Sequence, residues 1–188
     1  MGIDANLPGG TYTAIVGHWL GAQGQRSVSI VRCGDARDLI KYEYVTRGVA
    51  LAPACEDFTQ TRASQYFAAS QFNTGDYNWA LVRQPLIVGA STGYGLDKWR
   101  ENYDQQRNIN SAFRNPARNQ ATPGAAVTSR HMFGDAVDMD VQSNTLAEWN
   151  DIRDALEDAF PSFIEPLNGP CSTGCVHGDW RNVDGGYR

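Results

Sequence analysis

The chain has 188 residues, 41% of them hydrophobic, so it can bury the core of one good-sized domain. Its formal net charge of -5 at pH 7, without a basic run, argues against nucleic-acid binding. No stretch approaches the roughly 20 apolar residues that a membrane-spanning helix needs, so we expect no membrane span.

Four cysteines are present, and none of them forms the CxxC pair of a cysteine-only zinc knuckle. An even number permits two disulfides in three connectivities. The simplest of these joins Cys33 to Cys55 and Cys171 to Cys175. Disulfides favour an oxidising compartment, so we expect a secreted or periplasmic protein, although residues 1–10 lack the pattern of a secretion signal. The alternative is four reduced, buried thiols.

Residues 1–62 have a β-rich pattern. Runs of β-branched and aromatic residues, separated by glycine-containing turns, predict four strands. These runs are Thr11–Leu20, Ser27–Arg32, Lys41–Thr46 and Val49–Ala52. The region shows no constellation of catalytic residues, so we predict a β-rich N-terminal module of unknown role.

Beyond residue 62 the pattern is mainly helical. Helices are predicted over Ala63–Phe72, Asp76–Val88 and Leu96–Gln106. Between the last two, GASTGYG has the glycine content of a loop. Asn108–Phe113 predicts a short strand that runs into the turn-prone RNPARN.

The strongest single helix is predicted over Thr145–Phe160. Its apolar residues recur at helical spacing: Leu146, Trp149, Ile152, Leu156 and Phe160. Thr145 and Glu148 have the spacing of a capping box, and Pro161 ends the pattern. A short strand over Phe163–Leu167 follows.

The first segment with candidate chemistry is SRHMFGDAVDMD, residues 129–140. After the turn at Gly134, polar and apolar residues alternate. In a strand, this alternation places Asp138 on one face and Val137 on the other, against the core. His131 precedes the turn and can fold back towards Asp138.

The second segment is CVHGDWR, residues 175–181, in which His177 and Asp179 share one face of a strand. If the two strands are neighbours, His131, Asp138 and His177 converge. Two imidazoles and one carboxylate suit catalytic zinc, because three protein ligands leave a fourth position open. The alternative from spacing alone is that the two histidines are unrelated surface or capping residues.

These residues match a known signature. Residues 129–138 have the form SxHxxGxAxD, which resembles the zinc D-alanyl-D-alanine carboxypeptidase and murein endopeptidase family, whose fold is shared with the Hedgehog signalling domain. The resemblance implies that His131 and Asp138 bind zinc, with His177, in an HxD context, as the third ligand. It covers residues 63–188 and leaves the N-terminal module uncovered.

A further segment, NSAFRNP at 110–116, is similar to the family's SGYRxP segment. The resemblance implies that Arg114 binds a substrate carboxylate or carbonyl, for which a planar guanidinium is well suited. Arg114 is also a candidate catalytic residue, because it could stabilise the developing oxyanion together with zinc. The resemblance also implies that Ser129 contacts substrate. The alternatives are a surface ion pair for Arg114 and a simple turn cap for Ser129.

The chain departs from the family at the general base. Many members place it two to six positions before the last zinc ligand, but residues 171–176 contain no carboxylate. A base must lie within hydrogen-bond reach of the attacking water. The candidates are Asp179, which shares a strand face with His177, and Glu165 on the preceding strand. We favour Asp179, with the alternative that it orients a histidine ligand instead.

We therefore predict an α+β fold. A small antiparallel sheet, packed by helices, carries the zinc site in residues 63–188, and residues 1–62 form the β-rich module. The predicted function is zinc-dependent hydrolysis of peptidoglycan stem peptides or cross-links at a D-Ala-containing bond, a substrate class that only the resemblance implies. The alternative is a catalytically inactive zinc-containing binding module of the same fold. We expect a monomer whose partners are peptidoglycan peptides.

Overall fold

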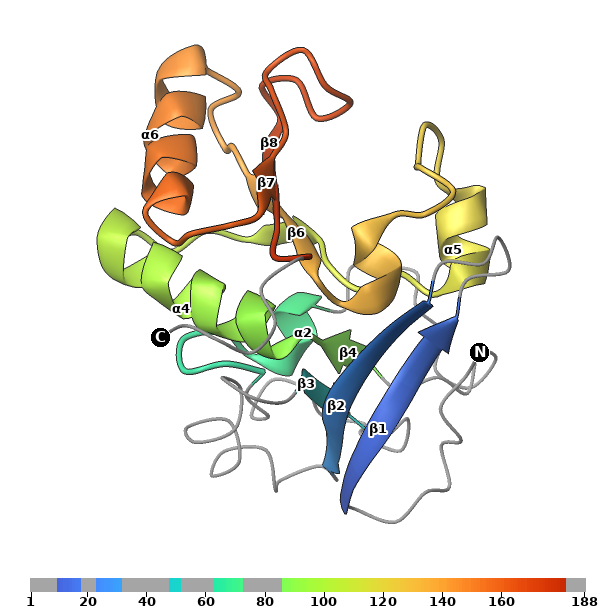
Figure 1. The fold of residues 1–188 in the computed structure, drawn as a ribbon. Helices are drawn as coiled ribbons and strands as arrows, with labels where there is room; N and C mark the ends of the chain where they lie inside the picture. Colours follow the sequence, from blue (N-terminus) through green and yellow to red (C-terminus); the bar gives the residue numbers. More distant parts are fainter. Residues whose placement is uncertain (1–9, 18–22, 32–47, 52–62, 73–85, 182–188) are drawn as a thin grey trace.

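The computed structural model describes residues 10–17, 23–31, 48–51, 63–72 and 86–181, and two four-stranded sheets organise them (Figure 1). The first sheet has the order β1-β2-β3-β4. Its strands are β1 Gly10–Gly17, β2 Gln23–Val31, β3 Gly48–Leu51 and β4 Leu86–Val88. β2 and β3 are parallel, and the other pairs are antiparallel.

Three of the four strands predicted in the N-terminal region are confirmed as β1, β2 and β3. The fourth, Lys41–Thr46, lies outside the described residues. The sheet is completed by β4, which comes from residues 86–88. The division of the chain after residue 62 stays a prediction.

The second sheet is antiparallel throughout and has the order β5-β6-β8-β7. Its strands are β5 Ile109–Ser111, β6 Ala136–Asp140, β7 Phe163–Ile164 and β8 Cys175–Asp179. β6 and β8 are therefore neighbours, and Asp138 lies directly opposite His177. This sheet and its helices confirm the predicted α+β class.

Helices cover the second sheet on the side away from the candidate site. They include α4 Ala90–Tyr103 and α6 Leu146–Glu157, which lie next to each other (Figure 1). The Trp149 indole of α6 donates to the Cys175 carbonyl at 3.1 Å, which ties α6 to β8. Val137 and Met139 are fully buried, so the predicted alternation along β6 is confirmed. Within the described part of the chain, no helix has the length and apolar character to cross a membrane.

The helix predicted over Ala63–Phe72 is wrong for its first half, because only α2, Ala69–Phe72, is helical. The buried carboxylate of Asp97 accepts hydrogen bonds from the Ser64 hydroxyl at 2.7 Å and from the backbone N–H of Gln65 at 2.9 Å. These bonds hold residues 64 and 65 in bends. A side-chain acceptor such as the Asp97 carboxylate offers the chain an alternative to the backbone hydrogen bonds of a helix.

The GASTGYG segment is also not the predicted loop, since α4 begins at Ala90. Its glycines serve packing. A Cβ on Gly95 would come within 2.3 Å of the Trp180 ring, so glycine lets the indole lie flat against the helix. The helix predicted over Asp76–Val88 is wrong at residues 86–88, which form β4, and its residues 76–85 lie outside the described residues.

The structure corrects the turn predicted at RNPARN and shortens the helix predicted over Thr145–Phe160. RNPARN is not a turn: α5, Pro116–Ala121, begins there, with the Asn115 side chain accepting from the Arg118 backbone N–H at 2.8 Å. The helix predicted up to Phe160 is confirmed with its Thr145 cap, but it ends at Glu157. Consequently Phe160 lies beyond the helix and is 68% exposed.

Candidate metal centre

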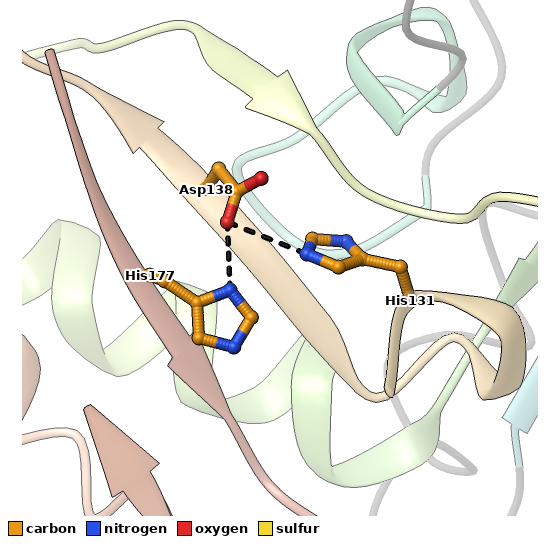
Figure 2. A group of neighbouring side chains, drawn as sticks. All are labelled: His131, Asp138 and His177. Atoms are coloured by element: carbon orange, nitrogen blue, oxygen red, sulfur yellow. Dashed lines mark hydrogen bonds and ion pairs between the residues drawn. The ribbon is translucent and has the colours of Figure 1, made fainter. Parts of the chain in front are cut away.

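Asp138 joins the two histidines at the centre of the second sheet. Its Oδ1 atom lies 2.7 Å from Nδ1 of His177 and 3.3 Å from Nε2 of His131 (Figure 2). One ligand atom from each of the three residues lies within 4.8 Å of the other two. Three donors from three separate elements therefore converge as the sequence predicts.

The short 3-10 helix η1, Arg130–Phe133, presents His131. The turn after it has Gly134 at φ +72°, a left-handed conformation that favours glycine. A Cβ there would also lie 2.6 Å from the Ile87 carbonyl oxygen of β4. Packing against the first sheet therefore requires glycine at this turn, and the turn directs His131 back over β6.

A backbone carbonyl determines which nitrogen of His131 faces the centre. Nδ1 of this buried side chain lies 2.7 Å from the Ala112 oxygen, which can only accept, so Nδ1 carries the proton. In the neutral ring Nε2 then carries no proton and can bind a metal, and it lies 3.3 Å from Oδ1 of Asp138. Metal-binding histidines are commonly oriented by such a hydrogen bond.

The three side chains form a strongly coupled ionic group. Burial by itself would raise the pKa of Asp138, but hydrogen bonds and charge from His131 and His177 outweigh it and hold the pKa well below its ordinary value. Burial by itself would lower the pKa of His177, yet Asp138 and Asp179 together raise it to about 9. In the metal-free protein at neutral pH, His177 is therefore a cation paired with Asp138.

Comparison with known families bears on these residues. A model of the family described as Peptidase M15 matches residues 67–165, which is more than half of the chain. The chain belongs to the Peptidase M15 family. The matched segment includes His131 and Asp138 and ends before His177. No curated protein and no solved structure matches the chain.

Membership of the M15 family supports a metallopeptidase acting on peptides. The three converging donors fit such a metal. Two imidazole nitrogens and a carboxylate oxygen are a ligand set of catalytic zinc sites, and the set leaves one position open. The carbonyl that fixes His131 supplies the supporting contact that such ligands need.

A cleft of about 580 Å³ opens over this centre of the M15 chain. Its walls include Arg114, Ser129, Glu165 and Phe163 as well as the three convergent side chains. Asp179 is not among the residues that line it and is fully buried. The two carboxylates considered for the general base therefore occupy different environments.

Asp179 lies behind His177 rather than in the cleft. Its carboxylate is held by Arg181, whose Nε donates to Oδ1 at 2.7 Å, and its Oδ2 lies 3.6 Å from Nε2 of His177. Burial would raise the pKa of Asp179, but hydrogen bonds from Arg181 and His177 lower it to about 2. Asp179 is therefore ionised at neutral pH, and it lies on the side of the His177 ring away from Asp138.

Arg114 and Ser129 both line the cleft. The Arg114 backbone N–H donates to the His131 carbonyl at 3.1 Å, which ties the segment after β5 to η1. Within the described residues Nε of Arg114 is buried without a hydrogen-bond partner. The negative charge of Asp138 acts on the Arg114 guanidinium. Ser129 precedes η1, but its side chain makes no capping hydrogen bond there.

Three groups at the site were not predicted from the sequence. The Ala112 carbonyl, which orients His131, carries no side-chain signal. Arg181 follows Asp179 by two residues, so alternation could have suggested their contact. Phe163 is 42% exposed, borders the cleft and packs edge-on against His177 with ring centroids 6.2 Å apart.

Proposed function

We propose that this M15 chain is a zinc peptidase that hydrolyses peptidoglycan stem peptides or cross-links. The observation that carries the proposal is the convergence of His131, Asp138 and His177 at the floor of a cleft, with Nε2 of His131 freed by the Ala112 carbonyl. The D-Ala-containing bond follows from the family resemblance of the signature.

Each of the three residues would offer zinc a specific atom. These atoms are Nε2 of His131, a carboxylate oxygen of Asp138 and Nδ1 of His177, which already face one another. His177 would then turn its Nε2–H towards Asp179, which keeps the ring oriented. When bound, zinc would activate water and polarise the scissile carbonyl.

We assign the proton-transfer role to Glu165. Its side chain is half-buried and borders the cleft, and one carboxylate oxygen accepts from the Cys171 backbone N–H at 3.3 Å. A carboxylate bordering the cleft can reach water and a leaving amine, which general acid–base catalysis requires. Asp179 has no access to the cleft and is engaged by Arg181, which supports an orienting role for it.

Arg114 and Ser129 would position the peptide. Among the described residues Nε of Arg114 has no hydrogen-bond partner, and this supports binding of a substrate oxygen, because a buried donor is costly unless it is paired. A guanidinium can take a terminal carboxylate, as in a carboxypeptidase substrate, or a peptide carbonyl, as in a cross-link. Ser129 adds a hydroxyl on the same wall.

Purified peptidoglycan fragments test this proposal. The protein is incubated with fragments carrying defined stem peptides and cross-links, with and without a chelator, and the products are identified by mass spectrometry. We expect cleavage that a chelator abolishes and added zinc restores. Tight zinc binding without any cleavage would instead favour the inactive binding module.

The setting of this activity is also proposed. The Cys171–Cys175 disulfide supports an oxidising compartment, so we propose a secreted or periplasmic protein that works as a monomer. The second predicted disulfide, Cys33–Cys55, lies outside the described residues. For residues 1–62 we retain the β-rich module, whose sheet is completed by β4, without assigning it a ligand.

A further inference from the structure

A disulfide borders the candidate metal centre. It joins Cys171, in the loop before β8, to Cys175, the first residue of β8. Cys175 and His177 are two residues apart in one strand and so share a face. The sulfur atoms of both cysteines and a carboxylate oxygen of Asp138 all lie within 4.8 Å of one another.

This disulfide closes a short loop. Its two cysteines are only four positions apart, so it removes less entropy from the unfolded chain than a disulfide that closes a longer loop. Both cysteines are half-buried and border the cleft, so reagents in the cleft can reach the bond. The disulfide therefore stands at a chemically accessible place beside Asp138.

We propose that reduction of Cys171–Cys175 creates a second set of metal ligands, two thiolates and the Asp138 carboxylate, for a thiophilic divalent cation such as zinc. This set shares Asp138 with the group that also contains His131 and His177. Thiolates are soft ligands that bind zinc and cobalt strongly. The inference concerns the cysteines and holds whether or not the chain cleaves peptidoglycan.

A simple reductant can cleave this disulfide. A trialkylphosphine gives two electrons to the S–S bond, and water supplies the oxygen of the phosphine oxide and the protons of the two thiols. A divalent cation then displaces both thiol protons to solvent. Once the S–S bond is broken, the sulfurs must separate to about 3.8 Å to share a tetrahedral ion at usual Zn–S distances, a small movement for a five-residue loop.

The shared ligand has a functional consequence. Both sets need Asp138, so a cation held by Asp138 and the two sulfurs leaves His131 and His177 without their third ligand. Reduction would therefore lower peptidase activity while increasing zinc affinity. The disulfide would act as a redox-sensitive element of the centre.

Cobalt(II) spectroscopy tests the inference independently of activity. The full chain is reduced with a phosphine, freed of reductant without oxygen, and loaded with cobalt. We expect a near-ultraviolet thiolate-to-cobalt band that is absent before reduction and disappears on reoxidation. Zinc competition should also show at least about tenfold tighter binding after reduction, because thiolates are added to the ligand set.

Matched variants assign the band. Cys171→Ser/Cys175→Ser keeps Cys33 and Cys55, so it should lose the band if the inference is right. Cys33→Ser/Cys55→Ser should keep it, which would exclude Cys33 and Cys55 as its source, and circular dichroism of the first variant checks that it is folded. An equal band in reduced wild type and in Cys171→Ser/Cys175→Ser, or no band in either, overturns the inference.

A histidine variant separates this inference from the proposed function. His131→Ala removes a ligand of the peptidase centre but not of the thiolate set. Its reduced form should still develop the band, although it should be inactive on peptidoglycan. A band that depends on His131 as strongly as on the cysteines would contradict a separate ligand set.

Discussion

Asp138 and His177 face each other across the antiparallel pair of β6 and β8, and their side chains meet at 2.7 Å. The carboxylate on one strand thereby holds a protonated imidazole on the next. This ion pair keeps both side chains in position without a metal. A metal that binds here has to take the place of the His177 proton.

The first prediction concerns metal content. His131→Ala and His177→Ala should each lower zinc affinity by more than about 100-fold, exceeding the 10- to 100-fold typical of losing a supporting residue. Competition with a chromogenic chelator measures this. His18→Ala is the control, because His18 belongs to neither candidate segment, and it should bind zinc as wild type does. Unchanged affinity in both site variants would reject the centre.

The second prediction is a pH dependence of zinc binding. The pKa of His177 is raised to about 9, so below that pH the metal must displace a proton. Apparent affinity should therefore rise about tenfold per pH unit between pH 6 and 8. The low pKa of Asp138 adds nothing in this range, because that carboxylate is already ionised. Chelator competition at several pH values checks the slope, and a flat profile would contradict it.

The third prediction separates the two acidic residues. Glu165→Gln should lower kcat by about 10²- to 10⁴-fold while zinc content stays the same, because the loss is of a proton-transfer group. Asp179→Asn should instead weaken zinc binding by about 10- to 100-fold, because it loosens His177. Activity assays at saturating zinc, with metal analysis of both variants, distinguish these effects.

The reverse pattern would restore Asp179 as the base. In that case Asp179→Asn would lose kcat with full zinc occupancy, and Glu165→Gln would be close to wild type. Arg181→Met provides a further check. It leaves both carboxylates in place but removes the Asp179 partner, so it should resemble Asp179→Asn if that residue acts through His177.

The fourth prediction concerns Arg114. Arg114→Lys keeps the charge but removes the planar, two-point donor, so kcat/KM should fall by about tenfold or more. Zinc binding should not change, because no nitrogen of Arg114 is in the ligand group. Arg118→Lys is the control, since its exposed side chain lies on α5 and outside the cleft lining. An equal effect of both substitutions would argue against substrate contact by Arg114.

The fifth prediction tests the packing behind the site. Gly95→Ala should destabilise the protein by about 1–3 kcal/mol through overpacking against Trp180, although alanine favours helix in an exposed position. Chemical denaturation measures the change. Adding Trp180→Phe shrinks the ring, so the double variant should lose less stability than the sum of the two single variants. Strict additivity would mean that these residues do not touch.

Local sequence signals were sufficient for several elements. Thr145 and the apolar spacing of α6 predicted that helix, because capping and periodicity act within a few residues. The same holds for β6, where the alternation of polar and apolar residues predicted that Asp138 lies on one face of the strand and the buried Val137 and Met139 on the other. The N-cap and proline of α5 were equally local signals, although they were interpreted as a turn.

Long-range contacts decided the elements that were predicted wrongly. Residues 64 and 65 form bends because Asp97, more than thirty positions away, accepts their hydrogen bonds. Residues 90–95 are helical although rich in glycine, and Gly95 leaves the space that the Trp180 ring occupies. Asp97 and Trp180 both lie far along the chain from the segments that they contact. Local propensity alone therefore predicted a helix at residues 63–68 and a loop at residues 89–95.

For the candidate site, the sequence by itself determined the three potential ligands and the face on which Asp138 and His177 point. Strand periodicity and side-chain chemistry are local properties, and they were enough for that. Only the tertiary structure brought β6 beside β8, aimed the Ala112 carbonyl at His131, and placed Glu165 at the cleft with Asp179 buried behind His177. Those relationships depend on strand order and burial, which arise only when distant segments pack together.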